Sequence, residues 1–384
     1  MKVPALDGIR GIAVLMVMLH HLSEYLPHDS GPFSAIAAVL RTGWDGVDLF
    51  FALSGFLITG ILLDTKYAPN YFRSFYARRI LRIFPLYYTV LSAILLAALF
   101  PYIGPWLHPM LPVPHDRWFY FVYLNNWWPL LKDTWHGNII GHFWSLAVEE
   151  QFYLLWPLCV WLLPRKKLPW VAAFGIAIAV LIRCVLYYYF RPSRSIVENT
   201  FARMDTLLMG ALMAMLVRSP RALRSVRPYL YGIAAASLSV YIWFNTWGVH
   251  SHFGAVYRSV VQFSLIAIIF SAVVLYAFAT RDDRSTVQAA FCRPLLRRVG
   301  KYSYGMYVYH VPIMPVAAVI LHHLVSHTFN GPGSVAFIIG IILLTYAVAK
   351  LSFEHFESRF LKQKKRFSPQ EPVVKVQINE TIHT

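Results

Sequence analysis

The chain has 384 residues and is strongly apolar, with 58% hydrophobic and 14% charged residues. Soluble domains carry roughly 45–50% apolar and about 25% charged residues, so a soluble fold could not cover its surface here. A disordered chain would be far more polar. The three cysteines are too few for a disulfide framework and lack metal-site spacing. The net charge of +17 could suggest nucleic-acid binding, but in a membrane protein it indicates basic cytoplasmic loops.

Ten segments are predicted as membrane-spanning helices, because each is apolar over about 20 residues and a helix pairs its own backbone in lipid. The first ends at His20-His21 without a small-residue cleavage site, so we interpret it as a retained span. The proline- and tryptophan-rich stretch 102–142 is expected to contain an interfacial helix. The predicted spans are 8–26, 44–64, 80–101, 143–163, 168–189, 201–217, 228–246, 258–279, 302–324 and 333–354. The sequence therefore predicts an all-α, polytopic membrane protein.

The basic residues predict the orientation of these spans. With the N-terminus in the cytoplasm, 25 of the 35 lysines and arginines fall in inner segments and 6 in outer segments. This split follows the positive-inside rule, so both termini are predicted to be cytoplasmic. One membrane domain is expected over residues 1–360, followed by a basic, polar cytoplasmic tail over 361–384 that is expected to be disordered.

Ionisable residues inside spans are costly in lipid and are candidates for a functional site. Arg10 and His21 in the first span are eleven residues apart, or about three turns and roughly 16 Å along the axis, so they share one face. His20 points elsewhere. The alternative is that Arg10 only reaches the membrane surface and that His21 is a structural residue bonded to a backbone carbonyl.

Three further places in the spans carry acidic residues. Asp48 in the second span needs a partner, and pairing with an arginine is as plausible as a catalytic role. Glu149 and Glu150 in the fourth span are neighbours on a helix and cannot both face one partner. Arg203 and Asp205 begin the sixth span and could simply pair with each other.

A basic cluster lies at the predicted cytoplasmic start of the third span. Arg78, Arg79 and Arg82 could act as a phosphate clamp, since guanidinium groups bind phosphate oxygens in a bidentate manner. The alternative is that the cluster only marks the topology. The ninth span carries four more polar residues, Tyr302, Ser303, Tyr304 and His310.

Many of these residues lie in longer stretches that occur in a fixed order. The stretches are Leu6–Val14 with His21, Gly46–Thr59, Phe75–Pro85, Phe143–Tyr153, Arg203-Met204-Asp205, Tyr302-Ser303-Tyr304 with His310, and Ser352-Phe353 with Glu357. Together they resemble the acyltransferase family 3 integral membrane proteins, which move acyl groups onto extracytoplasmic glycans, lipids or secondary metabolites. The resemblance covers about residues 4–360, and only His20 departs from the usual tyrosine or phenylalanine. No extracytoplasmic esterase-like domain follows the last span, so we expect a stand-alone member.

The resemblance implies an acyl-CoA-dependent O-acyltransferase of the bacterial inner membrane. Acyl-CoA, with acetyl-CoA expected, would be the cytoplasmic co-substrate, and a hydroxyl of a glycan, glycolipid or secondary metabolite would be the acceptor outside. No metal, permanently bound cofactor or nucleic acid is expected. The acceptor, the acyl chain and the oligomeric state are not readable from the sequence.

The resemblance also implies a role for each candidate residue. His21 would be the general base on the acceptor hydroxyl, and a transient acyl-histidine is left open. Its catalytic partners would be Glu149, Glu150 and Asp48. The donor would be bound by Arg10, Arg78, Arg79, Arg82, Tyr302, Ser303 and His310. The acceptor would contact Trp144, Arg203 and Asp205.

Two other functions compete with this interpretation. A proton-coupled secondary transporter with a His/Glu relay would also need buried ionisable residues. Transporters usually show two related halves, and the chain has no second copy of Gly46–Thr59 or of Phe143–Tyr153. A receptor could bind its ligand through residues 102–142, but it would not need Arg10 and His21 on one face.

Overall fold

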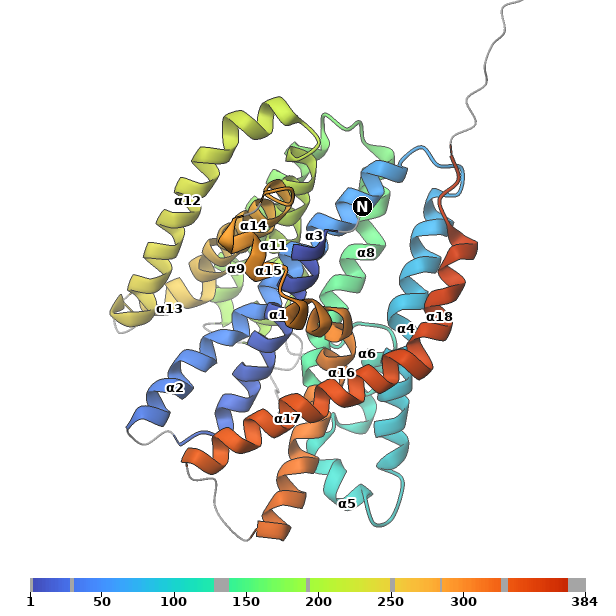
Figure 1. Cartoon of the computed structure of the whole chain (residues 1–384), viewed down its shortest axis with the longest axis vertical. Coiled ribbons are helices and arrows are strands. Elements are labelled where there is room, and N and C mark those ends of the chain that lie inside the picture. The colour runs from blue at the N-terminus through green and yellow to red at the C-terminus, as the bar shows by residue number, and fades with distance from the viewer. Residues whose placement is uncertain are drawn as a thin grey trace, which may run out of the picture.

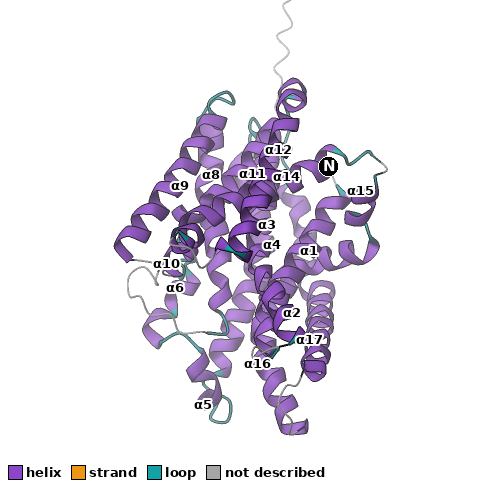
Figure 2. Cartoon of the chain, turned by 90° about the vertical axis from the view of Figure 1, so that its left-hand side faces the viewer, coloured by secondary structure: helices purple, strands orange, loops and turns teal. Residues whose placement is uncertain are grey.

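The computed structural model describes residues 3–27, 31–127, 138–190, 194–248, 253–283, 285–325 and 331–371. Over these ranges the chain is helical and contains no β-strand, which confirms the predicted all-α class. Figure 1 and Figure 2 show a bundle in which both ends of the described chain lie in the upper half, with α5 at the bottom.

Ten long helices of the described residues overlap the ten predicted segments, although α4, α12 and α16 begin eight or nine residues earlier than predicted. They are α1 (Pro4–Leu22), α3 (Gly46–Thr65), α4 (Tyr71–Ala97), α8 (Trp144–Leu162), α9 (Leu168–Phe190), α11 (Thr200–Leu216), α12 (Pro220–Thr246), α14 (Gln262–Ala279), α16 (Pro294–Val325) and α17 (Gly331–Ser352). The shorter helices are α2 (Pro32–Arg41), α5 (Gly104–Leu107), α6 (Trp118–Phe121), α10 (Arg194–Glu198), α13 (Gly254–Val256), α15 (Thr286–Phe291) and α18 (Ser358–Gln363).

Among the described residues, six helical segments are long and apolar enough to cross a membrane, so the protein is a multi-pass membrane protein. They are Pro4–Tyr25, Pro32–Thr65, Tyr71–Ala97, Leu168–Phe190, Gly254–Ala279 and Gly331–Phe367. Helix α11 has only 17 residues, and the polar run Glu149-Glu150-Gln151 makes α8 less apolar. Three of the helices outside the six, α8, α11 and α16, carry candidate site residues.

The structure differs from the prediction in the stretch 102–142 and at the start of the tail 361–384. Within the described part of 102–142, helix is confined to short turns such as α5 and α6, so an extended interfacial helix is absent there. The predicted tail 361–384 begins inside α18, and a short 3-10 helix over Lys364–Phe367 follows it. The tail beyond Glu371 lies outside the described residues.

Glycines allow close helix crossings around the middle of the bundle. A Cβ atom on Gly300 of α16 would lie 1.7 Å from the Asp7 carbonyl oxygen of α1. A Cβ atom on Gly55 of α3 would lie 1.8 Å from the Leu207 carbonyl oxygen of α11. Small residues permit such backbone contacts in membrane bundles, so α1 with α16 and α3 with α11 are tightly paired.

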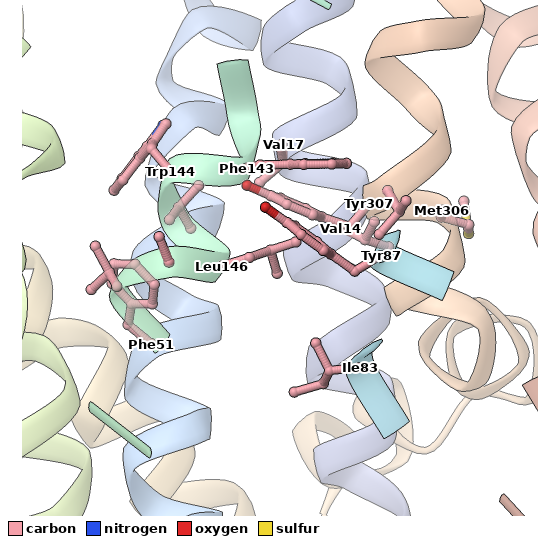
Figure 3. Packing of buried hydrophobic residues seen from close by; sticks show 14 of the residues in the cluster. Val14, Val17, Phe51, Ile83, Tyr87, Phe143, Trp144, Leu146, Met306 and Tyr307 are labelled. Carbon is pink, nitrogen blue, oxygen red and sulfur yellow. The ribbon is translucent and has the colours of Figure 1, made fainter. Parts of the chain in front are cut away.

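The start of α8 is fixed by aromatic packing. Figure 3 shows Phe143, Tyr87 and Tyr307 gathered in one buried cluster, with Trp144 nearby. The ring centroids of Tyr87 and Phe143 are 4.8 Å apart, and the Tyr87 hydroxyl donates to the Tyr120 carbonyl oxygen at 2.8 Å. This packing sets the position of the polar residues in the next two turns of α8.

Candidate active site

A cavity of about 210 Å³ lies between α1, α3, α4, α8 and α16. These helices correspond to the first, second, third, fourth and ninth predicted spans. The polar residues that line the cavity are Arg10, Ser54, Arg79, Arg82, Ser145, Glu149, Tyr153, Ser303, Tyr304 and Tyr307. Apolar side chains of α3 cover much of the remaining wall.

Three guanidinium groups reach this cavity from the first turns of two helices. Arg10 forms an ion pair with Asp7 at 2.8 Å and is 37% exposed. Arg79 and Arg82 lie against tyrosine rings, 5.9 Å from the Tyr153 ring centroid and 5.8 Å from that of Tyr304. Neither has a carboxylate within ion-pair distance among the described residues, so their donors can serve an anion in the cavity. Of the predicted cluster, Arg78 alone is not part of the lining.

The two glutamates of α8 take different positions, as expected for helix neighbours. Glu149 lines the cavity, where its carboxylate interacts with the Ser54 and Tyr153 hydroxyls and, through its charge, with Arg79 and Arg10. Ser54 and Tyr153 also share a hydrogen bond. Glu150 is not part of the lining, and its Oε1 is buried without a hydrogen-bond partner. Glu149 is therefore the carboxylate placed to meet a substrate.

His21 lies beside His310, which comes from the opposite end of the sequence. Their ring centroids are 5.1 Å apart, and His21 Nδ1 lies 3.4 Å from His310 Nε2. His21 Nδ1 also lies 3.0 Å from the Val17 carbonyl oxygen, and His310 Nδ1 lies 2.6 Å from that of Tyr307. Because a carbonyl oxygen only accepts, these partners assign the hydrogen to both Nδ1 atoms.

This tautomer decides what His21 can do. His310 Nε2 is then an acceptor facing His21 Nδ1, and His21 Nε2 keeps its lone pair. His21 Nε2 makes no hydrogen bond to any described residue. The hydrogen bond from His21 to a backbone carbonyl, which the structural alternative predicts, is therefore present. It uses Nδ1 and leaves Nε2 able to accept a proton. His21 is not itself part of the cavity lining. His310 lies between His21 and the lining residue Tyr307, and the ring centroids of His310 and Tyr307 are 5.5 Å apart.

Asp48, Arg203 and Asp205 are buried in ion pairs. Asp48 Oδ1 accepts from Arg203 Nη2 at 2.8 Å, and neither side chain is exposed. Asp205 pairs with Arg183 at 2.7 Å, so the expectation that Arg203 and Asp205 pair with each other is wrong. Residues two apart on a helix do not face each other. The ion pairs hold α11 to α3 and α9, and the predicted roles of these residues in catalysis and acceptor binding stay predictions.

Two other predicted contacts lie away from the cavity. The Tyr302 hydroxyl donates to Glu354 Oε1 at 3.1 Å, whereas the adjacent Ser303 faces the cavity. The ring of Trp144 stacks on that of Trp44 with centroids 5.7 Å apart. Both tyrosine and tryptophan are buried, so their predicted substrate contacts stay predictions.

Sequence reasoning missed the pair formed by Ser145 and Tyr307. Their hydroxyls share a hydrogen bond in the cavity wall, and the Tyr307 hydroxyl donates to the His142 carbonyl oxygen at 2.9 Å. A signal was available, because Ser303, Tyr307 and His310 recur at helical spacing and share one face of α16. The described residues bring no three potential metal ligands together.

Comparison with known proteins then identifies the family. The sequence profile of an acyltransferase domain matches residues 3–350. The chain belongs to this acyltransferase family. The match confirms the resemblance that the ordered motifs carry, and the cavity is where several of those motifs meet.

Two relatives align with nearly the whole chain. The chain is 29% identical over 382 residues to the peptidoglycan O-acetyltransferase OatA of Listeria monocytogenes. It is 27% identical over 378 residues to the O-acetyltransferase OatA of Staphylococcus aureus. The alignments cover 94% of this chain but only 56% and 57% of the relatives, so the chain spans just over half of their length. No solved structure matches.

Proposed function

We propose that this protein is an O-acetyltransferase that moves the acetyl group of cytoplasmic acetyl-CoA to a hydroxyl group of an extracytoplasmic glycan. The observation that carries the proposal is one cavity with Arg10, Arg79 and Arg82 among its walls and with Glu149 further along it. The names of the two relatives support acetyl as the acyl group, and one of them names peptidoglycan. Peptidoglycan fragments are therefore the first acceptor to test.

The proposed topology has ten spans and both termini in the cytoplasm. It rests on the agreement between the ten predicted segments and ten long helices, and on the excess of basic residues in the inner loops. In this orientation the arginines face the compartment that contains acyl-CoA. Because a bilayer core is roughly 30 Å thick, donor and acceptor can meet only if each enters the protein from its own side.

The arginines would hold the donor by its phosphate groups, since bidentate guanidinium–phosphate contacts are strong and directional. The thioester end would then extend along the cavity past Glu149 toward Ser145 and Tyr307. In the cavity wall the Tyr307 hydroxyl donates to the His142 carbonyl oxygen, so the Ser145 hydroxyl donates to Tyr307. Rotation of the Ser145 hydroxyl away from Tyr307 would let it donate instead to the oxyanion that forms at the thioester carbonyl. Negative charge on Glu149 would hold Arg10 and Arg79 in place.

His21 would carry the proton transfers. As the acceptor oxygen attacks the thioester carbonyl carbon, His21 Nε2 takes the hydroxyl proton and becomes part of an imidazolium. Collapse of the tetrahedral intermediate breaks the carbon–sulfur bond, and the imidazolium returns the proton to the departing CoA thiolate. The Val17 carbonyl oxygen accepts the His21 Nδ1 hydrogen and so holds the tautomer that this step requires. His310 would act as a positioning residue, because its Nε2 lone pair also faces that hydrogen.

Acetyl transfer by the purified protein tests the proposal. The protein in detergent is supplied with acetyl-CoA and soluble peptidoglycan fragments, and CoA release and acetylated fragments are measured by mass spectrometry. Arg82→Gln should raise KM for acetyl-CoA more than it lowers kcat, because phosphate contacts act on the ground and transition states alike. Arg224→Gln, at an exposed arginine of α12, is the matched control and should change neither constant.

Two results would contradict the proposal. One is a protein that binds acetyl-CoA but transfers acetyl to no glycan acceptor. The other is movement of a solute with protons and no CoA release, which the proton-coupled transporter predicts. The family match does not favour that transporter.

A further inference from the structure

The segment after α17 folds back along the first turns of α4, as Figure 1 shows for α18. Two polar residues hold it there by hydrogen bonds: Ser74 of α4 and Asn70, the N-cap residue of that helix. The Ser74 hydroxyl donates to the Phe367 carbonyl oxygen at 2.9 Å. Asn70 Nδ2 donates to the Ser368 carbonyl oxygen at 2.9 Å, and Asn70 Oδ1 accepts from the Gln370 backbone N–H at 3.0 Å. The segment 358–370 is therefore docked at several points beside the arginine cluster.

This docking turns one basic side chain of the segment toward the arginines. Lys362, Lys365 and Arg366 are exposed, whereas Lys364 is half-buried. The guanidinium charges that act most strongly on the Lys364 ammonium are those of Arg82, Arg79, Arg78 and Arg10. Lys364 forms no ion pair with a carboxylate of the described residues, so it lies at the edge of this basic cluster.

Carboxylates act on three of these five cations: Asp7 pairs with Arg10, the Glu357 charge acts on Arg82, and the Glu149 and Glu150 charges act on Arg79. The cations still outnumber these carboxylates, so a bound anion would be favourable here. The cavity that begins at Arg10, Arg79 and Arg82 would receive the acyl end of a donor, which places the donor's phosphates at the entrance. Arginines supply bidentate contacts to phosphate, and a lysine adds a mobile point charge with three donors. Arg78, which does not line the cavity, lies among the groups around Lys364 and would belong to the same entrance.

We infer that the docked segment 358–370 completes the donor entrance and that Lys364 binds a phosphate group of acyl-CoA. This inference rests on the proposed function, because it names a further residue of the same donor site. Lys364 would contribute to donor affinity and not to the chemical step, since it lies at the opposite end of the donor from the thioester.

The test measures KM and kcat for acetyl-CoA, and in parallel the Kd for CoA by thermal shift of the full chain in detergent. Lys364→Gln should raise KM and Kd about fivefold with kcat unchanged, as expected for one partly exposed charge contact. Lys365→Gln, at the exposed neighbouring lysine, should change neither constant. Asn70→Ala loosens the docking and should raise KM in the same direction.

A double variant separates a binding role from simple packing. If Asn70 acts only by positioning Lys364, Asn70→Ala combined with Lys364→Gln should be no worse than Lys364→Gln alone. Equal KM and Kd for Lys364→Gln and wild type, with CoA bound normally by both, would overturn this inference and leave the proposed function standing. A wild-type protein that binds no CoA would instead contradict the proposed function itself.

Discussion

Asp48 offers a sharp test of whether a buried carboxylate in this family is structural or catalytic. Its side chain and that of Arg203 are fully buried, 2.8 Å apart, and Thr206 adds one hydrogen bond to Asp48 Oδ1 at 3.2 Å. We predict that Arg203→Met and Asp48→Asn each destabilise the protein strongly. The double variant should recover most of the loss, because it removes both charges together.

The magnitude follows from what each single change leaves behind. Arg203→Met leaves the Asp48 carboxylate buried with only the Thr206 hydroxyl, and a lone buried charge of this kind costs about 3–5 kcal/mol. Asp48→Asn leaves the Arg203 guanidinium over the Phe263 ring, 4.1 Å from its centroid, and a cation–π contact can offset about 2 kcal/mol of that cost. The double variant should lose less than either single variant, since it removes both buried charges and leaves only a neutral amide beside the Thr206 hydroxyl.

The assay is unfolding by SDS titration in mixed micelles, followed by tryptophan fluorescence, with acetyl transfer per folded molecule measured alongside. Asp64→Asn is the control, because Asp64 is 66% exposed in its pair with Arg218 and should cost no more than about 1 kcal/mol. Single variants as stable as wild type would refute the reasoning. A stable Asp48→Asn protein that has lost transfer would show that Asp48 is catalytic.

Three further predictions concern the site and its scaffold. His21→Ala should abolish acetyl transfer while leaving a folded protein, and His20→Ala should be milder; a dead His20→Ala with an active His21→Ala would reverse the assignment. Arg79→Gln should raise KM for acetyl-CoA, and raised salt should reproduce part of that effect in wild type but less in the variant. Gly300→Val should cost about 1–3 kcal/mol in SDS unfolding because its side chain meets a backbone carbonyl, whereas Gly340→Val, with open space around it, should be neutral.

The helices and several residues of the cavity wall could be predicted from the sequence because both follow from local patterns. Runs of apolar residues give the spans, and Arg10 with His21 on one face follows from helical periodicity. The separation of Glu149 from Glu150 follows from the same geometry. These features need no knowledge of which helices touch.

Pairing between distant residues could not be predicted in this way. His310 reaches His21 only because α1 packs on α16, and 289 positions separate the two residues. Arg203 forms its ion pair with Asp48 and not with Asp205 because α11 crosses α3 closely at Gly55. The proposed role of Lys364 likewise depends on the packing of segment 358–370 against α4, which no local sequence pattern predicts.

The most direct test of the account is the sidedness of acetyl transfer. Inverted membrane vesicles expose the cytoplasmic face, so radiolabelled acetyl-CoA is added outside while a soluble peptidoglycan fragment is trapped in the lumen. The account predicts label on the trapped fragment in vesicles with the wild-type protein and none with His21→Ala. Label that appears only on fragments added outside, or equal labelling with His21→Ala, would contradict the claim that donor and acceptor meet at His21 from opposite sides of the membrane.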